Sequence, residues 1–299
     1  MHEGFIGVFD VGVGGLSVLR ALQQALPMEA FWYVADQAHF PYGREQDEKA
    51  ILHWSDGIAR FLVERGAKLI VVACHAATAA ALQRLRMRYP QVPFVGVEPA
   101  LKPAVMATRS GVIGVLATEA TLRSQRYVHL VRRYASYVKI LSDPCPGLVE
   151  RIEAGDLDGP GVRRILRRAV EPMLEQGADT FVLGCTHYSF VEPTLRALVG
   201  PEAILLDSAP EVARRVQEVL FETGRARLLP RFPQGTRYFT TGDPRRFAQQ
   251  VVRLLGEDQS VSVHRLVWQE GRFLARVRPR EIPMAVTPSS AWQAMAVPA

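Results

Sequence analysis

The chain has 299 residues, of which 48% are hydrophobic and 22% are charged. This composition is typical of a globular protein with a substantial core, and the length favours two domains. The formal net charge is +6, but the basic residues are scattered or lie on single helix faces, so nucleic-acid binding is not expected as the main function.

The chain begins with Met1-His2-Glu3 and passes directly into an apolar segment at residues 5–9. This start lacks the basic and long apolar regions of a secretory signal. No apolar run approaches the ~20 residues that a membrane span needs. The cysteines Cys74, Cys145 and Cys185 include no close pair, which argues against a disulfide framework and a zinc site. A cytoplasmic protein with no membrane partner and no metal is predicted.

The first segments predict the opening of a doubly wound domain. An apolar strand at residues 5–9 is followed by a glycine-rich turn at residues 12–17 and then by a helical pattern. Glycine permits the tight backbone of such a turn, and the helix start can hold an anion. The turn lacks the final small residue of a dinucleotide fingerprint. Asp10 also puts a carboxylate where a pyrophosphate would lie, so a nucleotide is not expected.

Strand-like and helix-like segments then alternate in two similar sets, and the second begins near Glu98. This order predicts an α/β fold of two similar doubly wound domains with the site in the cleft between them. Residues 1–97 plus 210–256 are expected to form the first domain and residues 98–209 the second. Alternating residues at 261–268 and 273–277 suggest a hairpin within the segment 257–299, and proline and small residues predict a disordered tail after it.

Two cysteines occupy corresponding places in the two sets. Cys74 and Cys185 each end a short apolar run and stand before polar, helix-forming sequence. In a parallel sheet this position is the carboxyl end of a buried strand, where ligands bind. A nearby helix amino terminus lowers a thiol pKa from its usual ~8.5, so each thiol is expected to supply thiolate at neutral pH. A single cysteine at such a place is more often a small buried hydrophobe, but the pair suggests a two-base reaction.

Seven blocks of sequence resemble, in the same order, the signature blocks of the glutamate racemase family within the aspartate/glutamate racemase superfamily. They are residues 8–10 with 12–18, 40–44, 73–74, 114–121, 183–188, 207–208 and 240–244. The Gly-Cys-Thr-His run at residues 184–187 resembles glutamate rather than aspartate racemases. The matching blocks extend from about residue 5 to residue 256.

The resemblance implies a cofactor-independent enzyme that interconverts L- and D-glutamate and supplies D-glutamate for peptidoglycan. It places Cys74 and Cys185 on opposite faces of the substrate Cα, with Asp10 assisting the first and His187 the second. Glu150 occupies a position that supports the histidine in some members, and many members form homodimers. The positions that match the lining of the substrate pocket are Pro41, Tyr42, Gly43, Thr118, Thr121 and Thr186.

The chemistry of inversion agrees with two thiols. One thiolate removes the α-proton from one face while a thiol delivers a proton to the other, so two groups of similar acidity must stand in opposite protonation states. The α-proton is a very weak acid. A dry cleft with hydrogen-bond donors and helix ends must therefore stabilise the developing carbanion.

Three substrate-binding positions depart from the family pattern. Val11 stands where a serine is usual, and His75 and Ala76 stand where asparagine and threonine follow the first cysteine. Each lost hydrogen bond removes about 0.5–1.5 kcal/mol, and more toward a charged group. His75 is expected either to restore a contact as a cationic donor or to act as a base beside Cys74.

Three functions stay open at this point. The first is a glutamate racemase with an altered pocket. The second is a related superfamily enzyme for another acid, as maleate isomerases and hydantoin racemases are, because Val11 and Ala76 favour a less polar substrate. The third is a non-catalytic binding protein. Retention of Cys74, Cys185, Asp10 and His187 together argues against the third, since binding alone needs no matched acid and base.

Overall fold

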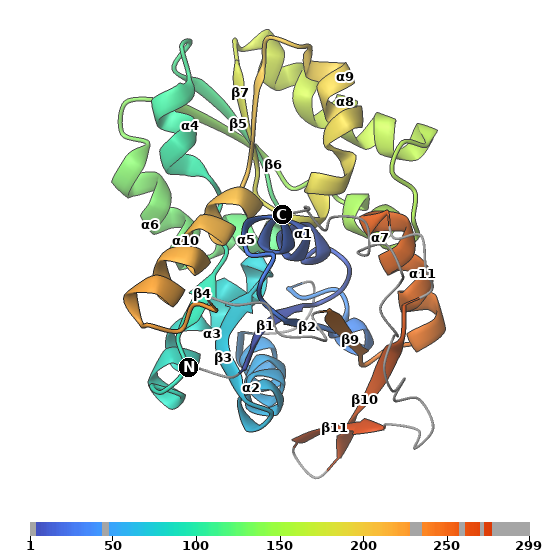
Figure 1. Ribbon diagram of the computed structural model, residues 1–299. Coiled ribbons are helices and arrows are strands. Elements are labelled where there is room, and N and C mark those ends of the chain that lie inside the picture. Colours follow the sequence, from blue (N-terminus) through green and yellow to red (C-terminus); the bar gives the residue numbers. More distant parts are fainter. Residues whose placement is uncertain (1–3, 44–47, 228–234, 257–260, 270–271, 277–299) are drawn as a thin grey trace, which may run out of the picture.

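A computed structural model describes residues 4–43, 48–227, 235–256, 261–269 and 272–276 (Figure 1). Two sheets organise these residues, one of seven strands and one of four. Figure 1 shows the two sheets in separate halves of the molecule, each covered by helices. The α/β fold with parallel sheets agrees with the fold class predicted from the alternating segments.

The first sheet is parallel except for its last strand. Its order is β11-β10-β9-β2-β1-β3-β4, and only β11 runs antiparallel, to β10. The strands are β1 (Phe5–Asp10), β2 (Phe31–Ala35), β3 (Ala67–Val72), β4 (Phe94–Gly96), β9 (Thr236–Thr240), β10 (Val263–Gln269) and β11 (Arg272–Arg276). The hairpin of β10 and β11 therefore extends the first sheet rather than standing apart from it. The tail expected to be disordered lies outside the described residues.

The second sheet is parallel throughout, in the order β6-β5-β7-β8. Its strands are β5 (Val112–Leu116), β6 (Lys139–Asp143), β7 (Thr180–Leu183) and β8 (Ile204–Asp207). In chain order, β5 to β8 follow the same arrangement as β1 to β4, with the first strand between the second and the third. The third strands, β3 and β7, precede Cys74 and Cys185. The two cysteines thus occupy equivalent positions in a repeated topology.

Helices cover both faces of each sheet because alternate strand residues point to opposite sides. Leu69 and Val71 of β3 join a core with α1 and α10, whereas Ile70 and Val72 join a core with α2 and α3. The helices of the first half are α1 (Leu16–Ala25), α2 (Glu48–Glu64), α3 (His75–Arg88), α10 (Ala209–Glu222) and α11 (Pro244–Leu255), with the short 3-10 helix η1 (Gln37–His39).

The second half has the same layering. Val115 of β5 and Tyr127 of α6 lie in a core on one face, while Phe181 of β7 packs with Leu166 of α8 on the other. Its helices are α4 (Leu101–Ala107), α5 (Glu119–Arg123), α6 (Gln125–Tyr134), α7 (Leu148–Glu153), α8 (Pro160–Glu175), α9 (Glu192–Val199) and the 3-10 helix η2 (Thr186–Val191). None of the helices in the described ranges is both long and apolar enough to cross a bilayer.

Candidate active site

Both expected cysteines lie at strand ends and face the interface between the two halves. Cys74 is the N-cap of α3 and Cys185 the N-cap of η2, each two residues beyond its strand. Their residues are only 6% and 7% exposed. The two thiols are close enough that Cys185 contributes to raising the pKa of Cys74. The repeated topology has thus brought two equivalent thiols into one buried site.

A histidine and a carboxylate extend from Cys185. Nδ1 of His187 lies 3.8 Å from Sγ of Cys185, and Nε2 lies 2.8 Å from Oε1 of Glu153. Burial opposes charge on His187, but its contacts with Cys185 and Glu153 raise its pKa above the usual value. Burial also opposes ionisation of Glu153, yet the contact with His187 keeps the pKa of that carboxyl low. The geometry therefore favours an imidazolium at His187, held between the sulfur of Cys185 and the carboxylate of Glu153.

Glu153 corrects the sequence-based assignment of the supporting carboxylate to Glu150. Both residues belong to α7, and the hydrogen bond to His187 comes from Glu153, one turn after Glu150. Its Oε1 also accepts a hydrogen bond from the backbone N–H of Val13 at 2.7 Å, and its backbone carbonyl accepts one from Nε2 of Gln250 at 2.6 Å. One residue of the second half is thus tied, through its side chain and its backbone, to two segments of the first.

Cys74 stands beside a different acid. Asp10 is 1% exposed, and its Oδ2 accepts a hydrogen bond from the backbone N–H of Gly15 at 2.7 Å. Burial raises the pKa of Asp10 and, together with the Asp10 charge, raises the pKa of the Cys74 thiol well above its usual value. The expected lowering of the Cys74 pKa by its helix terminus is therefore wrong, because burial outweighs the backbone N–H of Ala77. Cys74 is a thiol in this state.

The glycine-rich turn packs directly on the second half. A Cβ at Gly14 would lie 2.3 Å from Nδ1 of His187, and a Cβ at Gly12 would lie 1.9 Å from Oε1 of Glu153. Oγ of Ser17 donates to the Thr186 carbonyl at 3.1 Å. Glycine is required here because any side chain would occupy the space of His187 and Glu153.

The loop after β2 approaches the same interface. The hydroxyl of Tyr42 donates to Oδ2 of Asp36 at 2.6 Å, and burial raises the pKa of this tyrosine. Pro41 is partly buried, and a Cβ at Gly43 would lie 2.3 Å from the Cβ of Ala120 in the second half. Asp36 therefore anchors the loop within the first half, and Gly43 brings the loop against Ala120 of the second half. Arg44, the last residue of the sequence block, lies outside the described residues.

The remaining expected pocket residues divide into polar and apolar groups. Oγ1 of Thr118 and Oγ1 of Thr121 lie 3.1 Å apart at the start of α5. Thr186 is 4% exposed and follows Cys185 directly. Val11 is a buried apolar side chain, and Ala76 is partly buried and packs against the core of α2 and α3. Val11 and Ala76, which pack in the core cluster that contains Cys74, are therefore less polar than the three threonines.

His75 does not behave as the cationic donor expected from the sequence. The residue is 6% exposed, and burial lowers its pKa from 6.5 to about 3, although the backbone of Glu98 favours the charged form. At neutral pH the ring is uncharged. His75 lines a small cavity of about 10 Å³ together with Thr121 and Tyr127 of the second half. The ring therefore contributes to the seam between the two halves rather than a positive charge.

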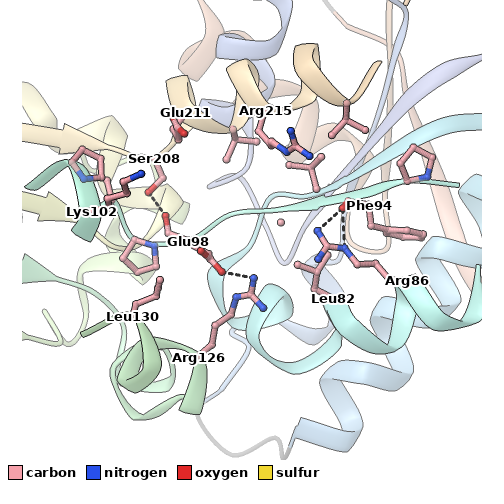
Figure 2. Close-up of a pocket in the computed structure, with 18 of the residues that line it drawn as sticks. Leu82, Arg86, Phe94, Glu98, Lys102, Arg126, Leu130, Ser208, Glu211 and Arg215 are labelled. Atoms are coloured by element: carbon pink, nitrogen blue, oxygen red, sulfur yellow. Dashed lines mark hydrogen bonds and ion pairs between the residues drawn. The ribbon is translucent and has the colours of Figure 1, made fainter. Parts of the chain in front are cut away.

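A larger cavity of about 600 Å³ lies where the chain crosses between the sheets (Figure 2). Figure 2 shows three arginines around it, Arg86 from α3, Arg126 from α6 and Arg215 from α10. Arg126 pairs with Glu98 of the connecting segment, and the Glu98 carbonyl accepts a hydrogen bond from Oγ of Ser208 at 2.7 Å. Burial and the charges of Arg126 and Arg215 lower the pKa of Arg86. Glu98, Glu211 and Glu222 also line the cavity, and Arg126 and Arg215 form ion pairs with Glu98 and Glu222, so this cavity at the two chain crossings carries both signs of charge with a small cationic excess.

Several interactions of the site carry no sequence signal. Gln37 and Gln250 bond to each other at 2.9 Å, and both approach Oε2 of Glu153. Only the fold brings these residues together from distant parts of the chain. The described residues hold no group of three or more potential metal-binding side chains.

Comparisons with known proteins agree with this geometry. The Asp/Glu/Hydantoin racemase family model matches residues 6–216. The chain is 50% identical over 256 residues to a glutamate racemase of Stutzerimonas stutzeri, covering 86% of this chain and 96% of that relative. A glutamate racemase isoform of Bacillus anthracis superimposes with a TM-score of 0.79 at 31% identity, covering 88% of this chain and 97% of that one.

Escherichia coli glutamate racemase, solved with L-glutamate and the activator UDP-MurNAc-Ala, superimposes with a TM-score of 0.77 at 30% identity. This match covers 91% of the present chain and all of the other. The chain therefore belongs to the aspartate/glutamate/hydantoin racemase family, a class of isomerases. Within that family its extended similarity to glutamate racemases supports racemisation of glutamate as its activity.

Proposed function

We propose that the protein interconverts L- and D-glutamate by moving protons between Cys74 and Cys185 on opposite faces of the substrate Cα. The observation that carries the proposal is the pair of buried thiols at equivalent strand ends, one beside Asp10 and the other beside His187. Two thiols in unlike surroundings supply the acid and the base that inversion needs.

The resting state gives the two thiols different roles. Cys185 lies beside the imidazolium of His187, whereas burial raises the pKa of Cys74 and keeps it protonated, so we assign the role of base to Cys185 and the role of acid to Cys74. The Cys185 thiolate takes the α-proton, and the electron pair of the C–H bond stays on Cα as a carbanion. The Cys74 thiol then protonates the opposite face and becomes the thiolate. The reverse direction starts from the state that this step leaves, with Cys74 as the thiolate and Cys185 as the thiol, and proton exchange with solvent interconverts the two states.

The altered wall of the site leaves one alternative substrate class. Val11 is 5% exposed and apolar, and Ala76 offers no hydrogen bond. This wall favours an acid less polar than glutamate, which the related superfamily enzymes accept. The relatives favour glutamate itself, because similarity to glutamate racemases extends over almost their full length.

The physiological role follows from the same relationship. The D-glutamate formed would supply peptidoglycan synthesis in the cytoplasm, and a homodimer is the proposed assembly. The intact mass under native conditions tests the assembly. A strain depleted of its own glutamate racemase tests the role, because expression of this chain should remove its need for added D-glutamate.

Isotope exchange tests the reaction directly. The protein is incubated separately with L- and D-glutamate in deuterium oxide, with optical inversion followed by circular dichroism and loss of the α-proton by NMR. Cys74→Ser and Cys185→Ser are expected to abolish inversion. The absence of exchange from either enantiomer would exclude glutamate and favour the less polar acid.

The cationic cavity suggests a second ligand. The Escherichia coli relative was solved with an anionic activator, and Arg86, Arg126 and Arg215 here surround a cavity large enough for a ligand of that size. We propose that this cavity binds an anionic effector. Titration calorimetry with UDP-MurNAc-Ala should show binding that Arg86→Ala and Arg215→Ala weaken. Arg163→Ala, on the exposed face of α8, is the matched control and should leave the affinity unchanged.

A further inference from the structure

His75 occupies a place where three parts of the fold meet. It is the first residue of α3 and follows Cys74 directly. The small cavity that it lines is also bordered by Glu98 of the connecting segment and by Thr121 and Tyr127 of the second half. Because the ring is almost wholly buried, it fills the seam between the two halves next to one catalytic thiol.

The backbone of Glu98 lies near enough to favour a proton on the ring, but no hydrogen bond of standard geometry from the described residues holds the ring in place. Among the described residues, neither Nδ1 nor Nε2 has a partner of standard geometry. Buried polar groups are almost always paired, and an unpaired one costs free energy. A proton on this ring would add the much larger cost of a buried charge, which agrees with its low pKa. The closed contact between the two halves is therefore compatible only with the uncharged ring of His75.

The charged and titratable groups around the ring do not replace it as a proton acceptor near neutral pH. Glu98 forms an ion pair with Arg126. Burial raises the pKa values of Cys74 and Tyr127, so both remain protonated. Among these side chains, only an imidazole ordinarily titrates between pH 5 and 8.

The catalytic residues are closed off from solvent in this arrangement. Asp10, Cys74, Cys185 and His187 are between 1% and 7% exposed. An amino acid must therefore enter by a movement that parts the two halves, and such movements are absorbed at a few residues of the connecting segments. His75 lines the small cavity together with Val97, Glu98 and Pro99, which belong to one of these segments.

We propose that His75 is a positioning residue for racemisation: its uncharged ring closes the seam beside Cys74, and a proton on the ring loosens the seam and withdraws Cys74 from its working position. The kinetic part of this inference rests on the proposed glutamate racemase function. The structural part concerns closure alone and can be measured without turnover.

The expected effect has a definite size and direction. The ring is taken to titrate at its usual pKa of 6.5 in the open form and to stay neutral in the closed form. The equilibrium constant for closure is then about tenfold lower at pH 5.5 than at pH 7.5. The KM for glutamate should rise by up to that factor as the pH falls from 7.5 to 5.5. Asparagine, the usual family residue here, has no charge to gain, so His75→Asn should remove this part of the pH dependence.

Two measurements test the inference. Steady-state KM and kcat are measured in both directions from pH 5.5 to 7.5 for the wild type, His75→Asn, His75→Gln and His129→Asn. His129 is an exposed histidine of α6 and serves as the matched control. Amide hydrogen exchange of the segment at residues 95–101 is measured without substrate on the same four proteins at each pH. Comparison at equal pH cancels the intrinsic rate of exchange.

The inference predicts that acid pH raises KM and increases exchange at residues 95–101 in the wild type and His129→Asn, and that both changes are several-fold smaller in either His75 variant. Equal pH dependence in all four proteins would overturn it. If glutamate is not turned over, the racemase proposal fails, but the exchange data still decide whether His75 controls closure. If His75→Asn does not fold, His75→Gln provides the same comparison.

Discussion

Oε1 of Glu153 lies 2.8 Å from Nε2 of His187 and 2.7 Å from the backbone nitrogen of Val13. The same carboxylate oxygen therefore orients a histidine of the second half and accepts a hydrogen bond from the glycine-rich turn of the first. This oxygen therefore links the position of His187, beside Cys185, to one of the contacts between the two halves. In the proposed two-thiol reaction, a change at Glu153 would act on Cys185 through His187.

Replacement of Glu153 by glutamine should impair the steps in which Cys185 takes part. Glutamine keeps the shape but loses the charge that favours imidazolium at His187, so kcat should fall roughly 10²-fold or more. Stopped-flow circular dichroism in both directions measures the loss. Glu150→Gln, on the same helix, is the control and should stay within about threefold of the wild type. A larger loss for Glu150→Gln than for Glu153→Gln would restore the assignment based on sequence alone.

The same pair should give the protein a stability optimum in mildly acidic solution. The lowered pKa of Glu153 contributes stability that is present above about pH 4.5 and is lost as pH falls through that lowered value. The raised pKa of His187 contributes stability that is full below pH 6.5 and is lost as pH rises through the raised value. Urea unfolding should therefore show the largest difference between wild type and Glu153→Gln between pH 4.5 and 6.5. A constant difference from pH 3 to pH 9 would contradict the charge pair.

Replacement of Gly14 by alanine should push the two halves of the site apart. Its Cβ would lie 2.3 Å from the His187 ring, and the shifts needed to relieve such a contact cost about 1–3 kcal/mol. Activity should fall at least tenfold, with a lower melting temperature. Gly235→Ala is the control because, among the described residues, no atom would lie within 4 Å of its Cβ. Wild-type kinetics for Gly14→Ala would show that the interface does not need this close approach.

The sequence predicted those features that depend on local pattern. Apolar runs and helical spacing located the strands before Cys74 and Cys185, because buried parallel strands are continuously apolar. The family resemblance assigned the supporting carboxylate to Glu150, whereas the structure pairs His187 with Glu153, one turn further along α7. The uncharged state of His75 and the raised pKa of Cys74 depend on burial by distant residues. No local pattern contains that information, and the cationic cavity likewise exists only where α3, α6 and α10 meet.

The unlike surroundings of the thiols should make them react differently with alkylating agents. Burial and Asp10 keep Cys74 protonated, whereas Cys185 faces the imidazolium of His187. Iodoacetamide at pH 7.5 should therefore label Cys185 first, and labelling of Cys74 should increase as pH rises above 9. Peptide mass spectrometry assigns the labels, with buried Cys145 as an internal reference. Glutamate should protect both catalytic thiols, and preferential labelling of Cys74 at pH 7.5 would reverse their proposed resting states.

Restoring polar groups at the altered wall should strengthen glutamate binding. Val11→Ser and Ala76→Thr reintroduce hydroxyls at positions where the family usually has them, each contributing about 0.5–1.5 kcal/mol when it bonds to the substrate. KM for glutamate should fall roughly two- to tenfold for each variant, with kcat less affected because these side chains bind rather than transfer protons. Initial rates over a range of glutamate concentrations measure this. An unchanged KM for glutamate, with a loss of activity toward a less polar acid, would show that Val11 and Ala76 are adapted to that other substrate.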